Sequence, residues 1–344
     1  MKPHWLLPFA LCLAQPAAAQ ESSSEGTPLF ASHDTLDVTL SGPIRQIARK
    51  AENSTDSHPA TLEADGETHA IDVSARGKSR RQRENCRFPP IRIAFREKPG
   101  EQSLFHRQGR IKLVTHCRDR DASEQTVLRE YAAYRLYNLV TPESLRVRMV
   151  RVRYIDDGKL VAHRLGFLIE DADDAARRLG AKEVDTGDIA VRQLDQQAAA
   201  RFALFQYMIG NTDWSLVLGP EGADCCHNTK LLGSTKDASA NLTPVPYDFD
   251  NAGLVDAPYA APNERLRTYS VTTRVYRGFC RFNTLLEPEM SRMISLRPAF
   301  EREIAATPYA EDKTKTAMSR YLGEFFDEIS SPETVAKKLT GKCR

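Results

Sequence analysis

Two acidic signatures between residues 205 and 255 constrain the fold of this chain more than any other feature. The first is Gly210-Asn211-Thr212-Asp213-Trp214, and the second is Tyr247-Asp248-Phe249-Asp250. Residues 198–209 are good helix formers with an apolar face, so Gly210 is expected to follow the end of a buried helix. Two prolines force extended backbone just ahead of the second signature. Both signatures are therefore predicted to lie on loops that follow regular elements.

This arrangement of acids suits phosphoryl transfer. In kinases one loop aspartate orients the attacking hydroxyl, while an asparagine and a second aspartate hold magnesium on ATP. Asp213 is the candidate for the first role and Asp248 for the metal ligand, with Asp250 either sharing the metal or capping a turn. The nearest suitable asparagine is Asn228, which serves only if the intervening hairpin folds back. The neighbouring His227 is a candidate base or ligand, although a hydrogen-bonded structural histidine is the commoner interpretation.

The two signatures resemble those of the spore-coat CotH-like atypical kinases and, more distantly, of the HipA-like kinases. The segment Ser74-Ala75-Arg76-Gly77-Lys78-Ser79 is similar to the Arg-Gly-x-Ser segment of the CotH-like set, and the resemblance covers roughly residues 70–260. It implies an α+β, protein-kinase-like two-lobe fold with an antiparallel-sheet N-lobe and a mainly helical C-lobe. It also implies ATP with Mg²⁺ or Mn²⁺ as cofactors. The chain departs from the family at Leu218, where the metal-binding asparagine is expected.

Within such an N-lobe, four residues are candidates for binding the nucleotide. Gly77 follows the first of three alternating strands, and Lys112 falls in the third, where a kinase places its phosphate-binding lysine. A helix predicted over residues 121–140 carries Glu130, which is expected to pair with Lys112. The alternatives are an exposed strand lysine and a surface acid. Glu170, at the end of the strand over residues 164–170, is a candidate for contact with ribose or adenine.

The predicted domain boundaries follow from these elements. Residues 1–19 form a secretory signal peptide with Lys2, an apolar run and a small-residue cleavage site. Residues 20–66 form a leader with an extra strand, residues 67–170 the N-lobe and residues 171–344 the C-lobe. The protein is therefore expected to be exported, either periplasmic or secreted. No other stretch is long and apolar enough to span a membrane.

The cysteines predict disulfides rather than metal sites. The chain has seven, of which Cys12 is lost with the signal peptide, leaving an even number in an oxidising compartment. Cys86 and Cys117 flank neighbouring strands and are predicted to bond. Adjacent Cys225 and Cys226 cannot easily bond to each other, so Cys280 is expected to pair with one of them. Cys343 has no assigned partner.

Charge is informative locally rather than globally. The net charge of +2 gives no reason to expect nucleic acid, but residues 76–120 hold fourteen Lys and Arg against four acids. Such a face suits a phosphate-rich ligand, although a solvated basic surface is commoner. Three hypotheses follow: an exported kinase acting on a protein or other hydroxyl substrate, a pseudokinase that binds a nucleotide or partner, and a metal-dependent phosphohydrolase. The last leaves Lys112 and Glu130 without a role, so it ranks third.

Overall fold

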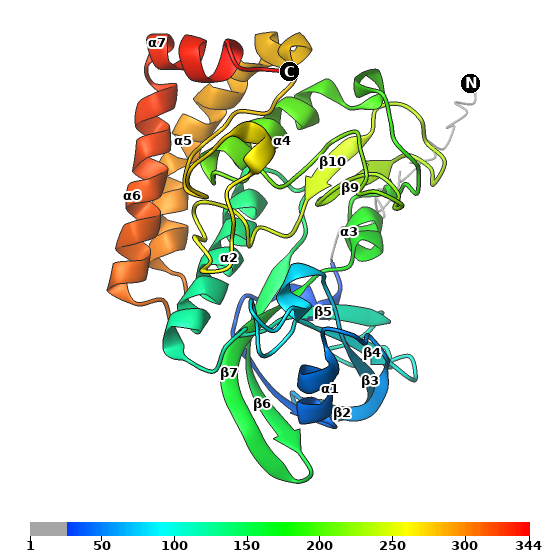
Figure 1. Cartoon of the computed structure of the whole chain (residues 1–344). Helices are drawn as coiled ribbons and strands as arrows, with labels where there is room; N and C mark the ends of the chain where they lie inside the picture. The colour runs from blue at the N-terminus through cyan, green and yellow to red at the C-terminus, as the bar shows by residue number, and fades with distance from the viewer. Residues whose placement is uncertain (1–25) are drawn as a thin grey trace, which may run out of the picture.

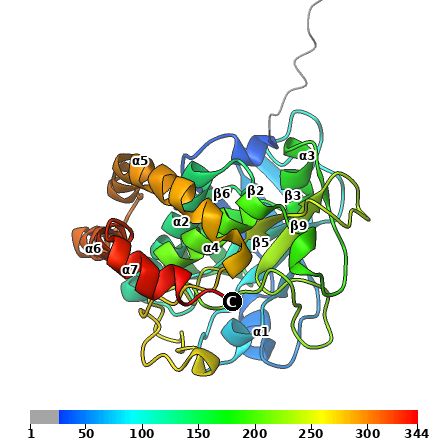
Figure 2. The same ribbon diagram turned by 90° about the horizontal axis from the view of Figure 1, so that it is seen from above.

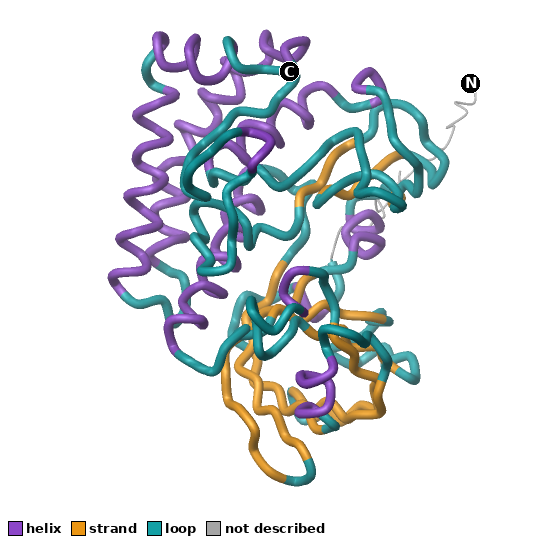
Figure 3. Tube along the Cα trace, viewed as in Figure 1, coloured by secondary structure: helices purple, strands orange, loops and turns teal. Residues whose placement is uncertain are grey.

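A computed structural model of the chain describes residues 26–344. The predicted signal peptide, residues 1–19, and the start of the leader lie outside the described residues. The described chain is a mixed α+β structure. Figure 3 shows its strands gathered mainly in one half and its longer helices in the other.

The strand-rich half is a closed seven-stranded barrel with the order β1-β2-β3-β4-β5-β7-β6. Its strands are β1 (Leu36–Ser41), β2 (His58–Ala64), β3 (Glu67–Ala75), β4 (Ile91–Phe95), β5 (Arg110–Val114), β6 (Val147–Asp156) and β7 (Lys159–Ile169). All neighbours are antiparallel except β1 and β6, whose parallel pairing closes the barrel. Alternate side chains such as Leu40, Ile71 and Val152 are fully buried inside it and form a separate apolar cluster.

The barrel differs from the expected sheet in two respects. First, β1 and β6 are parallel, so the sheet is mixed rather than purely antiparallel. Second, residues 36–64 are part of it, and the boundary expected at residue 66 falls in the hairpin turn at Asp65-Gly66 between β2 and β3. The sequence hides β2 because only Leu62 and Ala64 of its seven residues are buried. Burial alternates along β2, but of the inward-facing His58, Ala60, Leu62 and Ala64 only Leu62 is large and apolar, so the alternation is weak in the sequence.

The helix-rich half is built around α2 and α4. Its helices are α2 (Asp121–Val140), α3 (Ala172–Arg178), α4 (Gln196–Met208), α5 (Leu286–Ala305), α6 (Asp312–Ile329) and α7 (Pro332–Val335), while the short α1 (Ile44–Lys50) lies on the barrel. Figures 1 and 2 show α5, α6 and α7 grouped on one side of the molecule. Helix α2 packs against both α5 and β7, and thereby joins the two halves.

A small second sheet sits beside these helices and carries the approach to the second acidic signature. Its order is β10-β9-β8, from β8 (Lys182–Glu183), β9 (Thr229–Gly233) and β10 (Thr243–Pro246). Strand β10 pairs with β9 and leads directly to Tyr247. No helix among residues 26–344 combines the length and apolar character needed to cross a bilayer.

The disulfides agree with the sequence in one case and differ in another. Cys86 and Cys117 are bonded, as predicted. The pairing of Cys280 with Cys225 or Cys226 was wrong, because Cys280 bonds to Cys343 and the two adjacent cysteines bond to each other. Backbone pairing explains the Cys280–Cys343 bond. The Cys280 N–H donates to the Arg344 carbonyl, and the Arg344 N–H donates to the Gly278 carbonyl. These two bonds hold Cys343 beside Cys280.

Candidate functional site

Five of the predicted site residues line one cavity of about 540 Å³. They are Gly77, Asp213, Asn228, Asp248 and Asp250. Gly77 comes from the loop after β3, Asp213 from the loop after α4, Asn228 from the segment before β9, and the last two from the loop after β10. Lys112, Glu130 and Glu170 are not among its lining residues.

Asp213 is held in place by its own loop and by the folded-back hairpin. Helix α4 ends at Met208, and Gly210 follows with φ +66°, which turns the chain toward the cavity. The Asp213 Oδ1 lies 2.7 Å from Nε2 of His227. The Asn228 Nδ2 donates to the Asp213 carbonyl at 2.7 Å and to its Oδ2 at 3.1 Å. The hairpin therefore does fold back, which was the condition for Asn228 to join the site.

Asp213 favours the charged form of His227. The hydrogen bond that the imidazole makes to the Asp213 carboxylate raises the pKa of His227, which favours an imidazolium beside the carboxylate. Both side chains remain partly exposed, at 37% for His227 and 41% for Asp213, so solvent and ligands reach them. The pair is therefore an accessible acid–base couple whose geometry is fixed by backbone on both sides.

The second signature is organised by one buried arginine, Arg80. Its guanidinium bonds Glu130 Oε2 at 3.0 Å, Asp248 Oδ1 at 3.0 Å and Asp250 Oδ2 at 3.1 Å. Asp248 has φ +62°, and its backbone N–H donates to the Tyr134 hydroxyl on α2 at 2.8 Å. Helix α2, the loop after β3 and the second signature are thus tied together at one point.

This cluster gathers three carboxylates around Arg80, and the charge of the nearby Arg76 also acts on Asp248 and Glu130. Burial raises the pKa of Asp250 to about 7 and also raises that of Glu130. Asp248 is the most accessible of the three acids, with 34% of its side chain exposed. Carboxylate and amide oxygens are the ligands that Mg²⁺ prefers. Asp248, Asp250 and Asn228 bring oxygen atoms of this kind to the cavity wall, where both aspartates also bond Arg80.

The expected ion pair between Lys112 and Glu130 was wrong. Glu130 forms its ion pair with Arg80 instead, because the loop after β3 places the Arg80 guanidinium next to α2. The Lys112 Nζ lies 5.3 Å from the ring centre of Tyr247, a cavity-lining residue. Burial, assisted by the charge of Arg76, lowers the pKa of Lys112 to about 8. Lys112 is thus next to a lining residue but does not itself line the cavity, and its ammonium is still mostly charged at neutral pH.

Glu170 has a structural role that leaves its carboxylate no room for a nucleotide. It is fully buried, pairs with Arg178 at 3.0 Å and accepts the Arg146 N–H at 2.9 Å. The nearby carboxylates of Asp171, Asp173 and Glu183 lie within 4.8 Å of one another. Two of these carboxylates have structural roles, since Asp171 caps the N-terminus of α3 and Glu183 forms an ion pair with Lys230.

Sequence reasoning missed the most connected residue of the site. Arg80 lies in the basic run of residues 76–120, which pointed to an anionic ligand but singled out no member. No local pattern distinguishes Arg80 from the other cations of that run, because its role depends on packing against α2. No protein-family model matches this chain, and no curated protein matches it significantly.

Proposed function

We propose that the chain is an exported, ATP- and magnesium-dependent atypical kinase that transfers a phosphoryl group to a protein or another hydroxyl-bearing substrate. The observation that carries this proposal is the convergence of Gly77, Asp213, Asn228, Asp248 and Asp250 on one cavity. These residues come from three loops, after β3, between α4 and β9, and after β10, and the kinase reaction requires such a set together. The cavity volume of about 540 Å³ falls in the range of small-molecule sites.

The order of elements along the chain supports the same proposal. Consecutive strands β3, β4 and β5 precede α2, with Lys112 on the third strand and Glu130 on the helix. Strands β6 and β7 then follow, and the acidic loops come later. Protein kinases place their lysine, glutamate, catalytic aspartate and metal-binding aspartate in this order. The chain differs from that pattern because Glu130 forms its ion pair with Arg80 and not with Lys112.

The residues divide between nucleotide and acceptor. Asp248, Asp250 and Asn228 would hold magnesium, which neutralises phosphate charge when bound. Gly77 has φ +84° and open space where a side chain would begin, so the backbone there leaves room for phosphate. Asp213 orients the acceptor hydroxyl and takes its proton, while His227 and Asn228 fix the carboxylate.

One observation favours a second candidate function, nucleotide or partner binding without transfer. Arg80 already bonds both Asp248 and Asp250, and Asp213 already has a partner on each oxygen. A site whose acids are satisfied in this way can bind a ligand and still lack the free groups needed for catalysis. This pseudokinase alternative predicts binding with no phosphoryl transfer.

Two matched substitutions separate the candidate roles. Asp248→Asn is expected to abolish metal-dependent ATP binding, since its contact is to the ion. Asp213→Asn is expected to keep binding within about threefold and to lower transfer by about 10²–10⁴-fold, the usual contribution of a general base. Calorimetric titration with ATP and MgCl₂ measures the first effect, and transfer of labelled phosphate measures the second.

The control is Asp224→Asn, which changes an exposed carboxylate on the rim of the same cavity. It is expected to match the parent in both assays. A parent protein that binds ATP with metal but transfers no phosphate would establish the pseudokinase alternative. A parent that binds no nucleotide under any of these conditions would rule out the kinase and the nucleotide-binding form of the alternative.

A further inference from the structure

A separate cavity of about 450 Å³ shares no lining residue with the 540 Å³ cavity. Its wall is built from residues 30–33, from the C-terminal end of α2, from residues 141–146 ahead of β6, and from one arginine each of α3 and α5. Segments from four distant parts of the sequence therefore meet around this space.

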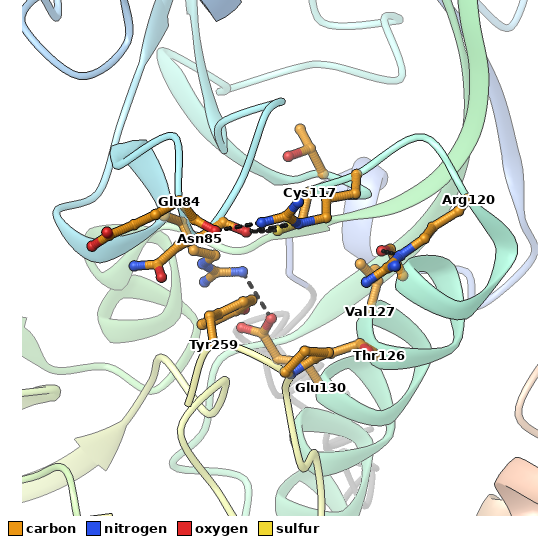
Figure 4. A pocket seen from close by; sticks show the side chains of 13 residues that line it. Glu84, Asn85, Cys117, Arg120, Thr126, Val127, Glu130 and Tyr259 are labelled. Atoms are coloured by element: carbon orange, nitrogen blue, oxygen red, sulfur yellow. Dashed lines mark hydrogen bonds and ion pairs between the residues drawn. The ribbon is translucent and has the colours of Figure 1, made fainter. Parts of the chain in front are cut away.

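The charged side chains in the wall of this cavity are all basic. They are Arg135, Arg146, Arg178 and Arg292, and no acid is among the described residues that line it. The smaller cavity in Figure 4 differs, because its wall includes Glu84 and Glu130 as well as arginines. An arginine-lined wall without carboxylates favours an anionic occupant.

Two of these arginines form ion pairs that fix their positions. Arg135 pairs with Glu303 at 2.7 Å, and Arg178 pairs with Glu170 at 3.0 Å. Neither glutamate lines the cavity. The Arg178 side chain is only 5% exposed and also donates to two backbone carbonyls, so its guanidinium is held rigidly.

The other two arginines, Arg146 and Arg292, have no such partner. No carboxylate oxygen of residues 26–344 lies within 4.0 Å of either guanidinium. Arg292 donates to the Val140 carbonyl at 2.6 Å. Burial, and after it the charge of Arg178, lowers the pKa of Arg146. The cavity wall thus carries two positive charges that no ion pair with the described carboxylates offsets.

This excess charge matches that of a phosphate group. A phosphate monoester carries about −1.5 to −2 charges at pH 7 and presents three strong acceptor oxygens, whereas a carboxylate carries a single charge. The planar fork of arginine also suits the geometry of phosphate oxygens. Leu139 and Pro142 add partly exposed apolar surface to the wall, and the volume is in the range of small-molecule sites.

We propose that this cavity binds a small molecule through its phosphate group, which Arg146 and Arg292 attract, while Leu139 and Pro142 contact the organic part. The site goes beyond the proposed kinase function and does not depend on it, because the two cavities share no residue. Helix α2 nevertheless connects them, since its C-terminal end lines this cavity and its Glu130 bonds Arg80.

Calorimetric titration of the whole chain without magnesium tests the proposal. Phenyl phosphate is expected to bind, and sodium benzoate, which keeps the ring but carries a single charge, is expected to bind about tenfold more weakly. Inorganic phosphate separates two sources of the group: weaker binding than that of phenyl phosphate assigns an ester, and equal or tighter binding assigns the free anion. Benzoate binding as tight as that of phenyl phosphate would overturn the phosphate assignment, and no binding of either phosphate compound would overturn the site.

Substitutions in the wall locate the binding. Arg146→Gln and Arg292→Gln are each expected to weaken phenyl phosphate binding by about tenfold or more, because each removes a charged donor. Arg302→Gln removes another exposed arginine of α5 outside the lining and should bind as the parent does. Ala31→Glu brings a carboxylate to the wall at an exposed position and should also weaken binding, so it remains informative if an arginine variant fails to fold. Parental affinity in both the Ala31→Glu variant and the Arg146→Gln/Arg292→Gln double variant would overturn the proposal.

A shortened chain tests whether the described residues make the site by themselves. A Cβ atom on Gly26 would lie 2.6 Å from Arg146 Nη1, so the first described residue passes beside this arginine. A chain beginning at residue 26 retains every lining residue and should bind phenyl phosphate at least as tightly as the whole chain. Loss of binding in the shortened chain would overturn the assignment to these arginines.

Discussion

Arg80 sets the electrostatics of the site, although many of its sequence neighbours are equally basic. A guanidinium presents five N–H donors in a planar fork, so one arginine can bond three carboxylates at once. The acids could be predicted because each belongs to a short motif with a definite backbone context. Arg80 could not, because its role depends on which of the six Lys and Arg between β3 and β4 the loop turns inward. That choice is made by tertiary packing against α2 and leaves no local pattern.

The raised pKa of Asp250 predicts a specific pH dependence of stability. Burial holds the folded-state pKa near 7, above the ordinary value near 4, with Asp248, Glu130 and Asp213 adding repulsion and Arg80 opposing it. Between these values the folded chain binds more protons than the unfolded chain, so this group lowers the free energy of unfolding as pH rises from about 4 to 7. Asp250→Asn is expected to remove about 2–4 kcal/mol of that decline.

Chemical denaturation in urea at pH 5 and pH 7.5 measures the change. Asp224→Asn, on the rim of the same cavity, should show the same decline as the parent. Some slope will remain in Asp250→Asn, because burial also raises the pKa of Glu130. An Asp250→Asn protein with the full parental slope would show that Asp250 is ionised throughout this range.

At the scale of elements, the sequence predicted what is locally encoded. The boundaries of α2 match the predicted helix over residues 121–140, because its apolar spacing is strong and Pro142 lies just beyond its end. Strand β3, which leads to Gly77, and strand β5, which contains Lys112, also lie where the alternation of apolar and polar residues predicted them. What failed was pairing: neither the β1–β6 contact nor the Cys280–Cys343 bond leaves a local pattern. Both join segments that are distant in the chain.

The Cys86–Cys117 bond is expected to support the site as well as the fold. It ties the loop that carries Arg80 to the end of β5, across 31 residues of sequence. Cys86→Ser/Cys117→Ser should lower the free energy of unfolding by about 2–4 kcal/mol, since the unfolded chain loses a constraint. It should also weaken metal-dependent ATP binding, because Arg80 loses its anchor.

Cys280→Ser/Cys343→Ser provides the matched control. This bond spans 63 residues and lies away from Arg80, so its loss should cost similar stability and leave ATP binding intact. Equilibrium denaturation and calorimetry measure the two effects. Equal loss of ATP binding in both double variants would mean that reduced stability, rather than the position of Arg80, accounts for the result.

At the scale of the molecule, two apolar cores share strands β5, β6 and β7, each of which contributes side chains to both. One fills the barrel, and the other joins α2, α4, α5 and α6. The barrel core depends on β1 and β2, which bring residues such as Leu40 and Leu62 into it. The N-terminal segment is therefore structural, whereas the sequence alone assigned it no clear purpose.

A chain beginning at residue 67 is expected to lose the barrel. Its β3 would lack β2 and its β6 would lack β1, and buried residues such as Ile71 and Val152 would face solvent. Hydrogen exchange should show rapid exchange of β3 and β6 amides, or the protein should be insoluble. A chain beginning at residue 26 keeps every described residue and should retain their protection. Protected β3 and β6 amides in the shorter chain would show that β1 and β2 are dispensable.

Closure of the barrel also limits how this protein can meet others. Proteins that recruit an extended peptide by β-augmentation need a strand with an open row of N–H and C=O groups. The barrel leaves such an edge on β7, where residues 159–166 pair with β6 but not with β5. The small sheet has two open sides, but β8 is only two residues long and β10 contains Pro244 and Pro246. Short strands and prolines are the usual means of blunting an edge against aggregation. Extension of a sheet by another polypeptide is therefore open at β7 of the barrel and blunted in the small sheet.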